Sequence, residues 1–324
     1  MNLSMIANLA GVSVSTASKA FAGSREISEE TRERIFQIAR ENGCFDKYIK
    51  NKYEKKVIAV IYPELRGGFY TDVLSILDEL IYKRGGIMIS SVCNFSAERE
   101  KELYTYYSAY AKVDGIIVVG MHDAINNSIN IPLVAMLSSV KCPHADTISS
   151  QLVNSIEEAV TYLKKLGHTR IGFAGESLTK SKQEAYKKAM HRAGMVVHPS
   201  DVKVSAKRFE EAGMEVMEEW LAQKNMPSAV LAAYDHIAIG LIKCARNHGM
   251  HIPEDLSVIG MDDIPIVPFM DTSISSINMH IQEACNLAVD VIFKKMENQY
   301  YAMRDDVIIK SQLIIRDSVG NAKH

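Results

Sequence analysis

The first 44 residues show short apolar faces separated by polar turns, a pattern that predicts three short helices. The first helix has an apolar face made by Ile6, Ala7, Leu9 and Ala10. It ends at the turn 11–13, and a second helix is predicted over 14–21, where small residues allow close packing on the first. A third is predicted to begin after Ser28, a favourable N-cap, and to end at 42–43. Two short helices joined by a tight, glycine-containing turn are typical of a helix-turn-helix, whose second helix fits the major groove of DNA.

From residue 57 onward, short apolar runs alternate with amphipathic segments of helical length. The apolar runs predict strands over 57–62, 87–92, 115–119, 133–136, 170–174, 229–232 and 257–260. The amphipathic segments predict helices over 70–83, 97–111, 151–166, 182–193, 212–223 and 236–248. This alternation predicts parallel sheets with right-handed crossovers, and its repetition in both halves suggests two similar lobes. Two open α/β lobes leave a crevice at the carboxyl ends of their strands, where a small molecule would bind.

Composition and charge narrow the class of protein. A chain of 324 residues exceeds what one hydrophobic core usually organises, so more than one domain is expected. No apolar run reaches membrane-spanning length, and no secretion signal is evident, so we expect a cytoplasmic protein. The five cysteines are dispersed without metal-ligand spacing, so we expect reduced thiols and neither metal nor cofactor. Residues 1–56 carry ten Lys/Arg against seven Asp/Glu, a net of +3 in a chain of net charge −2, a modest excess that supports contact with DNA phosphates.

The sequence resembles the LacI/GalR family of bacterial transcription regulators over nearly its whole length. In the N-terminal segment the resemblance is carried by Ile6-Ala7, Ala10-Gly11-Val12-Ser13, Thr16, Ser18-Lys19, Ile27-Ser28, Thr31-Arg32 and Ile35. In the remainder it is carried by 113–117, 166–172, 252–263 and 272–274. The string at 252–263 is far more specific than a glycine fingerprint.

The resemblance implies a small all-α helix-turn-helix head and an α/β core with two lobes, similar to periplasmic binding proteins, each lobe a Rossmann-like subdomain with a parallel sheet. The expected domains are a DNA-binding domain at 1–45, a hinge at 46–56 and an effector-binding and dimerisation core at 57–324. Lobe one is expected at about 57–150 and 279–305, and lobe two at about 151–278 and 306–324, with crossings near 149–151, 277–280 and 304–307.

The resemblance also implies which residues contact DNA. Val14, Ser15 and Lys19 occupy the base-reading positions, and a lysine there can donate to guanine O6 and N7. Phosphate contacts are expected from Ser13, Thr16, Ser18 and Arg25. For Ser18 a role in helix packing fits equally well. Arg25 would replace a contact that relatives make with an asparagine at the position of Ala22.

The linker departs from the family pattern. Five lysines lie between residues 44 and 56. The family has a Pro-Asn start here, and a leucine that wedges into the minor groove and kinks the operator. This chain lacks that proline and places Tyr53 near the leucine's register. Tyr53 could wedge between bases or pack on the core, and both interpretations stay open.

Three positions match effector contacts of the family. Lys182 replaces an arginine, Tyr234 precedes Asp235, and Asp262 could accept two hydroxyl hydrogen bonds from a sugar-like ligand or merely cap a loop. Further contacts are expected from Phe69, Tyr70 and Phe209, as apolar or stacking walls, and from Met136, where many relatives have an acidic residue. These departures favour a ligand less hydroxylated than a plain sugar, or a phosphorylated one.

The implied function is a sequence-specific repressor that binds near-palindromic, double-stranded operator DNA. The tail after Asp317 is too short and polar for the leucine-heptad helix that makes some relatives tetramers, so we expect a homodimer. A sugar, sugar phosphate or related metabolite in the crevice between the lobes is expected to control it. A co-regulator protein stays open as a further partner, and no membrane contact is expected. The first alternative, a periplasmic-type solute-binding protein, would have a signal peptide and no DNA-binding head. The second, an enzyme, is disfavoured because P-loop, Gly-x-Ser-x-Gly and metal-spaced His/Asp patterns are missing.

Overall fold

The computed structural model describes residues 1–48, 55–111, 113–120, 131–137, 144–223, 226–297 and 306–323. The chain divides into two compact units, Met1–Lys56 and Val57–His324, called here the head and the core. Among the described residues, no helix is both long and apolar enough to cross a bilayer.

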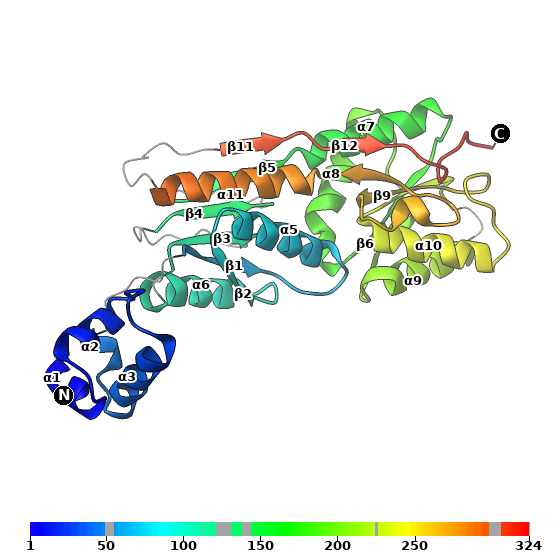
Figure 1. Cartoon of the computed structure of the whole chain (residues 1–324). Coiled ribbons are helices and arrows are strands. Elements are labelled where there is room, and N and C mark those ends of the chain that lie inside the picture. The colour runs from blue at the N-terminus through cyan, green and yellow to red at the C-terminus, as the bar shows by residue number, and fades with distance from the viewer. Residues whose placement is uncertain are drawn as a thin grey trace. The chain divides into compact units, whose positions relative to one another are not determined.

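The head is a bundle of four short helices, drawn in blue in Figure 1. They are α1 (Leu3–Leu9), α2 (Val14–Phe21), α3 (Glu29–Glu41) and α4 (Phe45–Tyr48). Side chains of Asn2, Ser13 and Ser28 cap the first three helices by accepting a backbone N–H. Gly11 has φ +63° in the turn between α1 and α2, a conformation that glycine adopts without strain.

Helix α4 extends the head beyond its expected boundary at residue 45. The rings of Phe45 and Phe36 lie 5.1 Å apart, and those of Tyr48 and Phe21 lie 5.7 Å apart. Residues 45–48 therefore belong to the head's aromatic core, and the expected hinge is correspondingly shorter at its start. Sequence alone missed this because α4 is a single turn of helix.

Lobe one of the core is built on a six-stranded sheet whose paired strands are all parallel, in the order β11-β5-β4-β3-β1-β2. Its strands are β1 (Val57–Tyr62), β2 (Ile87–Val92), β3 (Gly115–Val119), β4 (Leu133–Met136), β5 (Asp146–Ser150) and β11 (Asp306–Ile309). Its helices are α5 (Phe69–Lys83), α6 (Ala97–Thr105), the π-helical turn η1 (Tyr106–Tyr110) and α11 (Ile281–Glu297). Helices α5 and α11 pack together over one face of the sheet, and α6 with η1 cover the other.

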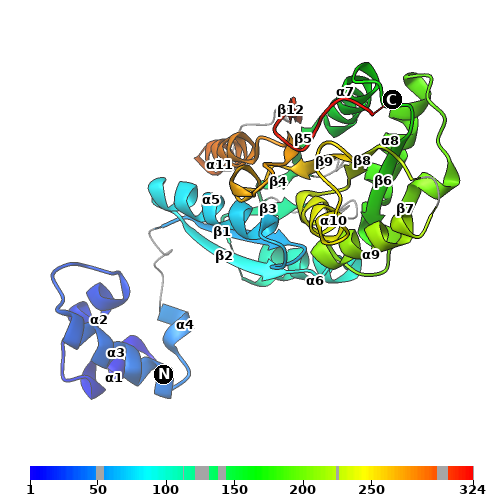
Figure 2. The same ribbon diagram turned by 90° about the vertical axis from the view of Figure 1, so that its right-hand side faces the viewer.

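Lobe two repeats this plan around a sheet of order β12-β10-β9-β8-β6-β7, in which only β12 is antiparallel to its neighbour. Its strands are β6 (Ile171–Glu176), β7 (Val202–Ser205), β8 (Ala229–Ala232), β9 (Ser257–Asp262), β10 (Ser275–Asn278) and β12 (Gln312–Ile314). Its helices are α7 (Leu152–Lys165), α8 (Lys180–Arg192), α9 (Phe209–Leu221) and α10 (Asp235–Asn247), with short 3-10 turns η2 (Ser177–Thr179), η3 (Pro199–Asp201) and η4 (Val267–Phe269). Helices α7 and α8 lie on one face and α9 and α10 on the other (Figure 2).

The chain passes between the lobes three times. It crosses after β5, after β10, and between β11 and β12. The third crossing was expected near 304–307, and this is wrong by a few residues: Val307 pairs with Ile148 in lobe one, so the chain leaves that lobe only after Ile309. Strand β11 lies at the edge of the lobe-one sheet, and nothing in its own sequence indicates which lobe it joins.

Candidate DNA-contacting face and ligand cleft

One face of helix α2 is exposed and the other forms the core of the head. Ala17, Ala20 and Phe21 are buried against α1 and α3. The exposed face carries Val14, Ser15, Ser18 and Lys19. The spacing of these four positions places them on one side of a helix, as a helix that enters the major groove requires. Arg25, in the turn after α2, is also exposed.

The hydroxyls at the start of α2 form its N-terminal cap. Ser13 Oγ accepts from the Thr16 backbone N–H at 3.0 Å, and the two hydroxyl oxygens lie 2.8 Å apart. At the other end of the helix, Lys19 Nζ donates to Glu26 Oε2 at 2.5 Å. The hydrogen bond and positive charge of Lys19 lower the pKa of the Glu26 carboxyl. Lys19 is thus paired with Glu26 at the edge of the exposed face.

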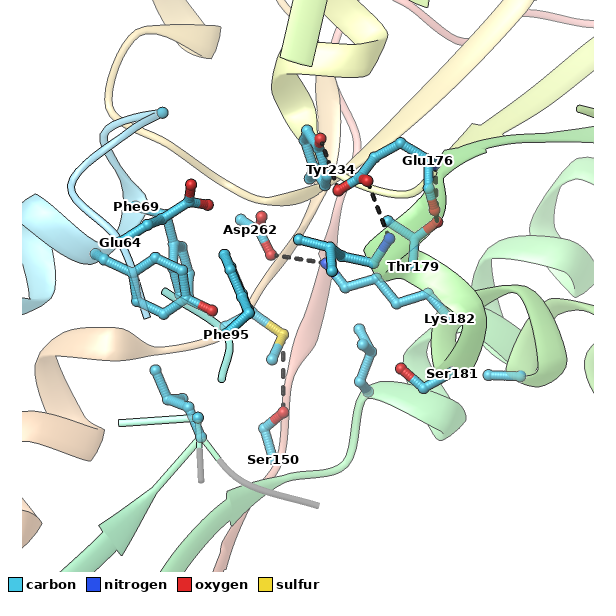
Figure 3. A pocket seen from close by; sticks show the side chains of 18 of the residues that line it. Glu64, Phe69, Phe95, Ser150, Glu176, Thr179, Ser181, Lys182, Tyr234 and Asp262 are labelled. Atoms are coloured by element: carbon cyan, nitrogen blue, oxygen red, sulfur yellow. Dashed lines mark hydrogen bonds and ion pairs between the residues drawn. The ribbon is translucent and has the colours of Figure 1, made fainter. Parts of the chain in front are cut away.

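The core contains a cavity of about 760 Å³ between its two lobes. Residues that line it follow the carboxyl ends of strands in both sheets: Glu64 follows β1, Phe95 follows β2, Tyr234 follows β8, and Asp262 ends β9. The cavity lies where the sequence pattern predicts a crevice, and its volume suits a small organic ligand. Figure 3 shows these side chains converging from the two lobes.

An ion pair lies in this cavity on the lobe-two side. Lys182 Nζ lies 3.2 Å from Asp262 Oδ1 (Figure 3). It also donates to the Ala233 carbonyl oxygen at 2.7 Å. The side chains of Lys182 and Asp262 are 21% and 13% exposed. Asp262 has φ +99°, in the left-handed region, where asparagine and aspartate are better tolerated than most other residues. The pair offers a ligand both a hydrogen-bond donor and an acceptor at one point.

Aromatic side chains form the walls on both sides. Phe69 and Tyr70 begin α5 in lobe one, with ring centroids 5.2 Å apart. Phe209 and Tyr234 stand in lobe two, with ring centroids 5.9 Å apart. Burial, together with the charge of Asp262, raises the pKa of the Tyr70 phenol, which therefore stays protonated and can donate or accept a hydrogen bond. All the effector residues predicted from the sequence except Met136 line the cavity.

Polar contacts of Arg208 and His236 join the lobes across the cavity. Arg208, which precedes α9, donates two hydrogen bonds to the Glu64 carboxylate, at 2.6 and 2.8 Å. The Arg208 and Glu64 side chains are 27% and 11% exposed. His236 Nε2 lies 2.6 Å from the carbonyl oxygen of Gly67. The contacts Arg208–Glu64 and His236–Gly67 are together called the latch. The sequence did not predict the latch, because each of its contacts joins residues more than a hundred positions apart.

Comparisons with known proteins identify the chain. The family described as bacterial regulatory proteins, lacI family, matches residues 2–44, and a periplasmic binding protein-like domain matches residues 160–319. The chain belongs to the LacI family of bacterial regulatory proteins. It is therefore a DNA-binding transcriptional regulator, and the solute-binding alternative is not favoured.

Relatives of this LacI-family chain match it over nearly its full length. The HTH-type transcriptional repressor CytR of Escherichia coli (strain K12) is 27% identical over 326 residues, covering 97% of this chain and 94% of the relative. The ribose operon repressor of Haemophilus influenzae is 27% identical over 330 residues, covering 98% of each chain. The structure of the lac repressor dimer bound to operator and the anti-inducer ONPF has a TM-score of 0.75 at 19% identity, covering 99% of each chain, and so shares the fold.

Met136 and Tyr53 are two site residues predicted from the LacI-family resemblance that the structure does not place at a functional site. Met136 does not line the cavity: it is fully buried among the apolar side chains beneath α11, because side chains alternate between the faces of β4. Its neighbour Leu137 lines the cavity instead. Tyr53 lies outside the described residues, so its role in the hinge stays a prediction.

A buried carboxyl supports the loop that carries Asp262. Asp235 accepts from the Ile264 backbone N–H at 2.8 Å and from the Ser276 hydroxyl at 2.6 Å. Its burial and the nearby charge of Asp262 raise the pKa of the Asp235 carboxyl to about 8. The folded protein therefore keeps a proton here that the unfolded chain releases near pH 4.

This raised pKa predicts a pH dependence of stability. Because the folded state binds the extra proton between about pH 4 and pH 8, the Asp235 contribution to the free energy of unfolding should fall as pH rises through that window. In Asp235→Asn this contribution is absent, so urea midpoints should fall less between pH 5 and pH 8 than in the parent. Equal slopes in the two proteins would show that Asp235 is ionised throughout.

Proposed function

We propose that this LacI-family chain is a cytoplasmic repressor that binds a near-palindromic operator as a homodimer and responds to a small ligand in the cleft. The exposed face of α2 supports the DNA-binding part of the proposal. The latched cavity supports the regulatory part, because a ligand that binds one arrangement of the lobes more tightly shifts the population toward it. The observation that carries the proposal is that one chain combines an exposed helix face suited to the major groove with a cavity between two lobes.

The sequence favours a less hydroxylated or a phosphorylated ligand, but the paired charges in the cavity support a different one: the ligand we propose is uncharged, with a ring and several hydroxyls, such as a sugar or a nucleoside. Lys182 and Arg208, two cationic side chains lining the cavity, are each already paired with a carboxylate. A phosphate held by Lys182 or Arg208 would have to break the ion pair of that side chain and also approach Glu176, which lines the same cavity. Arg66 also lines the cavity, so a phosphorylated ligand at that edge is the alternative. Hydroxyls can instead bridge Lys182 and Asp262 while the ring packs against Phe69 or Phe209. The similarity to a ribose operon repressor is in keeping with this class.

On the DNA side, Lys19→Ala tests whether α2 reads bases. If Lys19 contacts a guanine, the variant should bind its operator about 1–3 kcal/mol more weakly, with a much smaller loss on random DNA. Fluorescence anisotropy at fixed salt would measure both affinities. Equal losses on the two DNAs would make Lys19 a phosphate contact instead.

Glu26→Gln is the matched companion variant, because it removes the ion pair while keeping Lys19. It should tighten DNA binding modestly, since Lys19 no longer has to leave a carboxylate and one negative charge is lost from the DNA-facing side. Weaker operator binding in Glu26→Gln would mean that Glu26 itself holds Lys19 in its base-reading position.

A further inference from the structure

A cluster of three potential metal ligands lies in lobe two, on helices α9 and α10. Cys244 and His248 are separated by one turn at the end of α10, and Glu218 lies opposite them on α9. Cys244 Sγ lies 3.3 Å from Glu218 Oε1 and 3.9 Å from His248 Nδ1. His248 Nε2 lies 3.5 Å from Glu218 Oε2. One ligand atom from each residue falls within 4.8 Å of the other two.

The distance of 3.3 Å between Cys244 Sγ and Glu218 Oε1 and that of 3.5 Å between His248 Nε2 and Glu218 Oε2 fit a tetrahedral metal ion. With metal–ligand bonds of about 2.0 Å to nitrogen or oxygen and about 2.3 Å to sulfur, the atoms of such a ligand set lie roughly 3.3–3.6 Å apart. Cys244 is 1% exposed and fixed in the helix interface. The Glu218 and His248 side chains are 58% and 43% exposed, so small rotations can bring both onto an ion above the sulfur. A fourth position would face solvent.

A backbone contact prepares the histidine for this role. His248 Nδ1 lies 3.0 Å from the carbonyl oxygen of Cys244, one turn earlier in the chain. A carbonyl accepts only, so this contact places the imidazole proton on Nδ1 and leaves the lone pair on Nε2, the nitrogen nearer Glu218. Metal-ligating histidines commonly fix their other nitrogen in this way.

We propose that Glu218, Cys244 and His248 bind one zinc ion, with water as the fourth ligand. A thiolate, an imidazole and a carboxylate form a mixed sulfur, nitrogen and oxygen set, which suits Zn²⁺ better than the oxygen-preferring Ca²⁺ or Mg²⁺. The thiolate and carboxylate together balance the charge of the ion. The sequence pattern did not reveal the site, because Glu218 is brought to the Cys-x₃-His pair only by the packing of α9 on α10.

The ion would join two helices whose first turns line the ligand cleft. Phe209 begins α9, and His236 lies in the first turn of α10. The helices pack closely because Gly213 and Gly240 face backbone of the opposite helix, where a Cβ would overlap it. Bound zinc would therefore stabilise the relative position of the helices that carry these cleft residues, without itself touching the cleft ligand.

Zinc binding should be measured on the untagged, chelator-treated, full-length protein. We expect one zinc ion per chain at micromolar protein concentration, and Co²⁺ should give a thiolate-to-cobalt charge-transfer band. Zinc binding releases the thiol proton of its cysteine ligand, so the affinity should rise with pH. Zinc should also raise the thermal midpoint, because it binds only the folded state.

His248→Gln and Glu218→Gln are the decisive variants, because both keep all the cysteines and change exposed side chains. Each should weaken zinc binding by at least about tenfold and reduce the zinc-dependent rise in thermal midpoint. His251→Gln is the matched control, since His251 is an exposed histidine in the same lobe, and it should bind zinc as the parent does. Absence of stoichiometric binding, or the same affinity in both variants as in His251→Gln, would overturn the proposal.

Discussion

Replacing Asp262 with asparagine should weaken effector binding by about tenfold to a hundredfold, while the operator affinity of the ligand-free protein stays the same. A hydrogen bond to a charged group contributes about 1.5–3 kcal/mol, and asparagine keeps one oxygen acceptor but loses the charge. Asparagine is preferable to alanine because Asp262 has φ +99°, where alanine would add backbone strain. The variant therefore removes the carboxylate and keeps a residue type that tolerates this backbone conformation.

The experiment begins with a thermal-shift screen of sugars and nucleosides, which identifies a ligand by its stabilisation of the parent protein. Operator titrations with and without that ligand then give its coupling to DNA binding. Asp271→Asn serves as control, because the Asp271 side chain is 91% exposed and does not line the cavity. An unchanged ligand response in Asp262→Asn would remove Asp262 from the site.

Arg208→Gln should open the cleft and reduce effector affinity by up to about thirtyfold. The substitution breaks the paired hydrogen bonds to Glu64 and leaves two carboxylates, Glu64 and Glu176, without their cation. Breaking a fully buried pair costs about 3–5 kcal/mol, and partial exposure of Arg208 reduces the expected cost to about 2 kcal/mol. If that cost falls on the closed arrangement, the ligand has to supply it.

A double-mutant cycle with Glu64→Gln tests this interpretation. The double variant should recover part of the lost affinity, because neither glutamine leaves an unpaired charge in the cleft. Arg192→Gln is the control, since its ion pair with Glu157 joins residues of lobe two alone. Strictly additive losses would mean that Arg208 and Glu64 do not act together in holding the lobes closed.

The sequence predicted the apolar strands well and the polar ones poorly. The runs at 57–62 and 115–119 coincide with β1 and β3, whose residues are almost all buried. Strand β10 was missed because it begins with two serines. Ser275 and Ser276 are nevertheless fully buried and are hydrogen-bonded to Ser318 and Asp235, residues about forty positions away in the chain. Hydrophobic periodicity cannot register a strand whose burial depends on such distant partners.

Of the candidate site, too, the sequence predicted one part and missed another. Lys182 and Asp262 were found because a family motif marks each position, and the structure brings them within 3.2 Å of one another. The contact between Arg208 and Glu64 has no local motif, since it exists only when the two lobes face each other. Met136 was misassigned because homology marked the position while the direction of its side chain depends on the sheet.

Selection of bound sequences from a random duplex library, using the full-length protein, tests the central claim most directly. The account predicts enrichment of a two-fold near-palindrome by the parent and loss of base preference in one position of each half-site in Lys19→Ala. A cleft ligand from the thermal-shift screen should then change the affinity of the parent for the selected duplex, and change it much less for Asp262→Asn. Failure to enrich any motif at low salt, both with and without candidate ligands, would contradict the account.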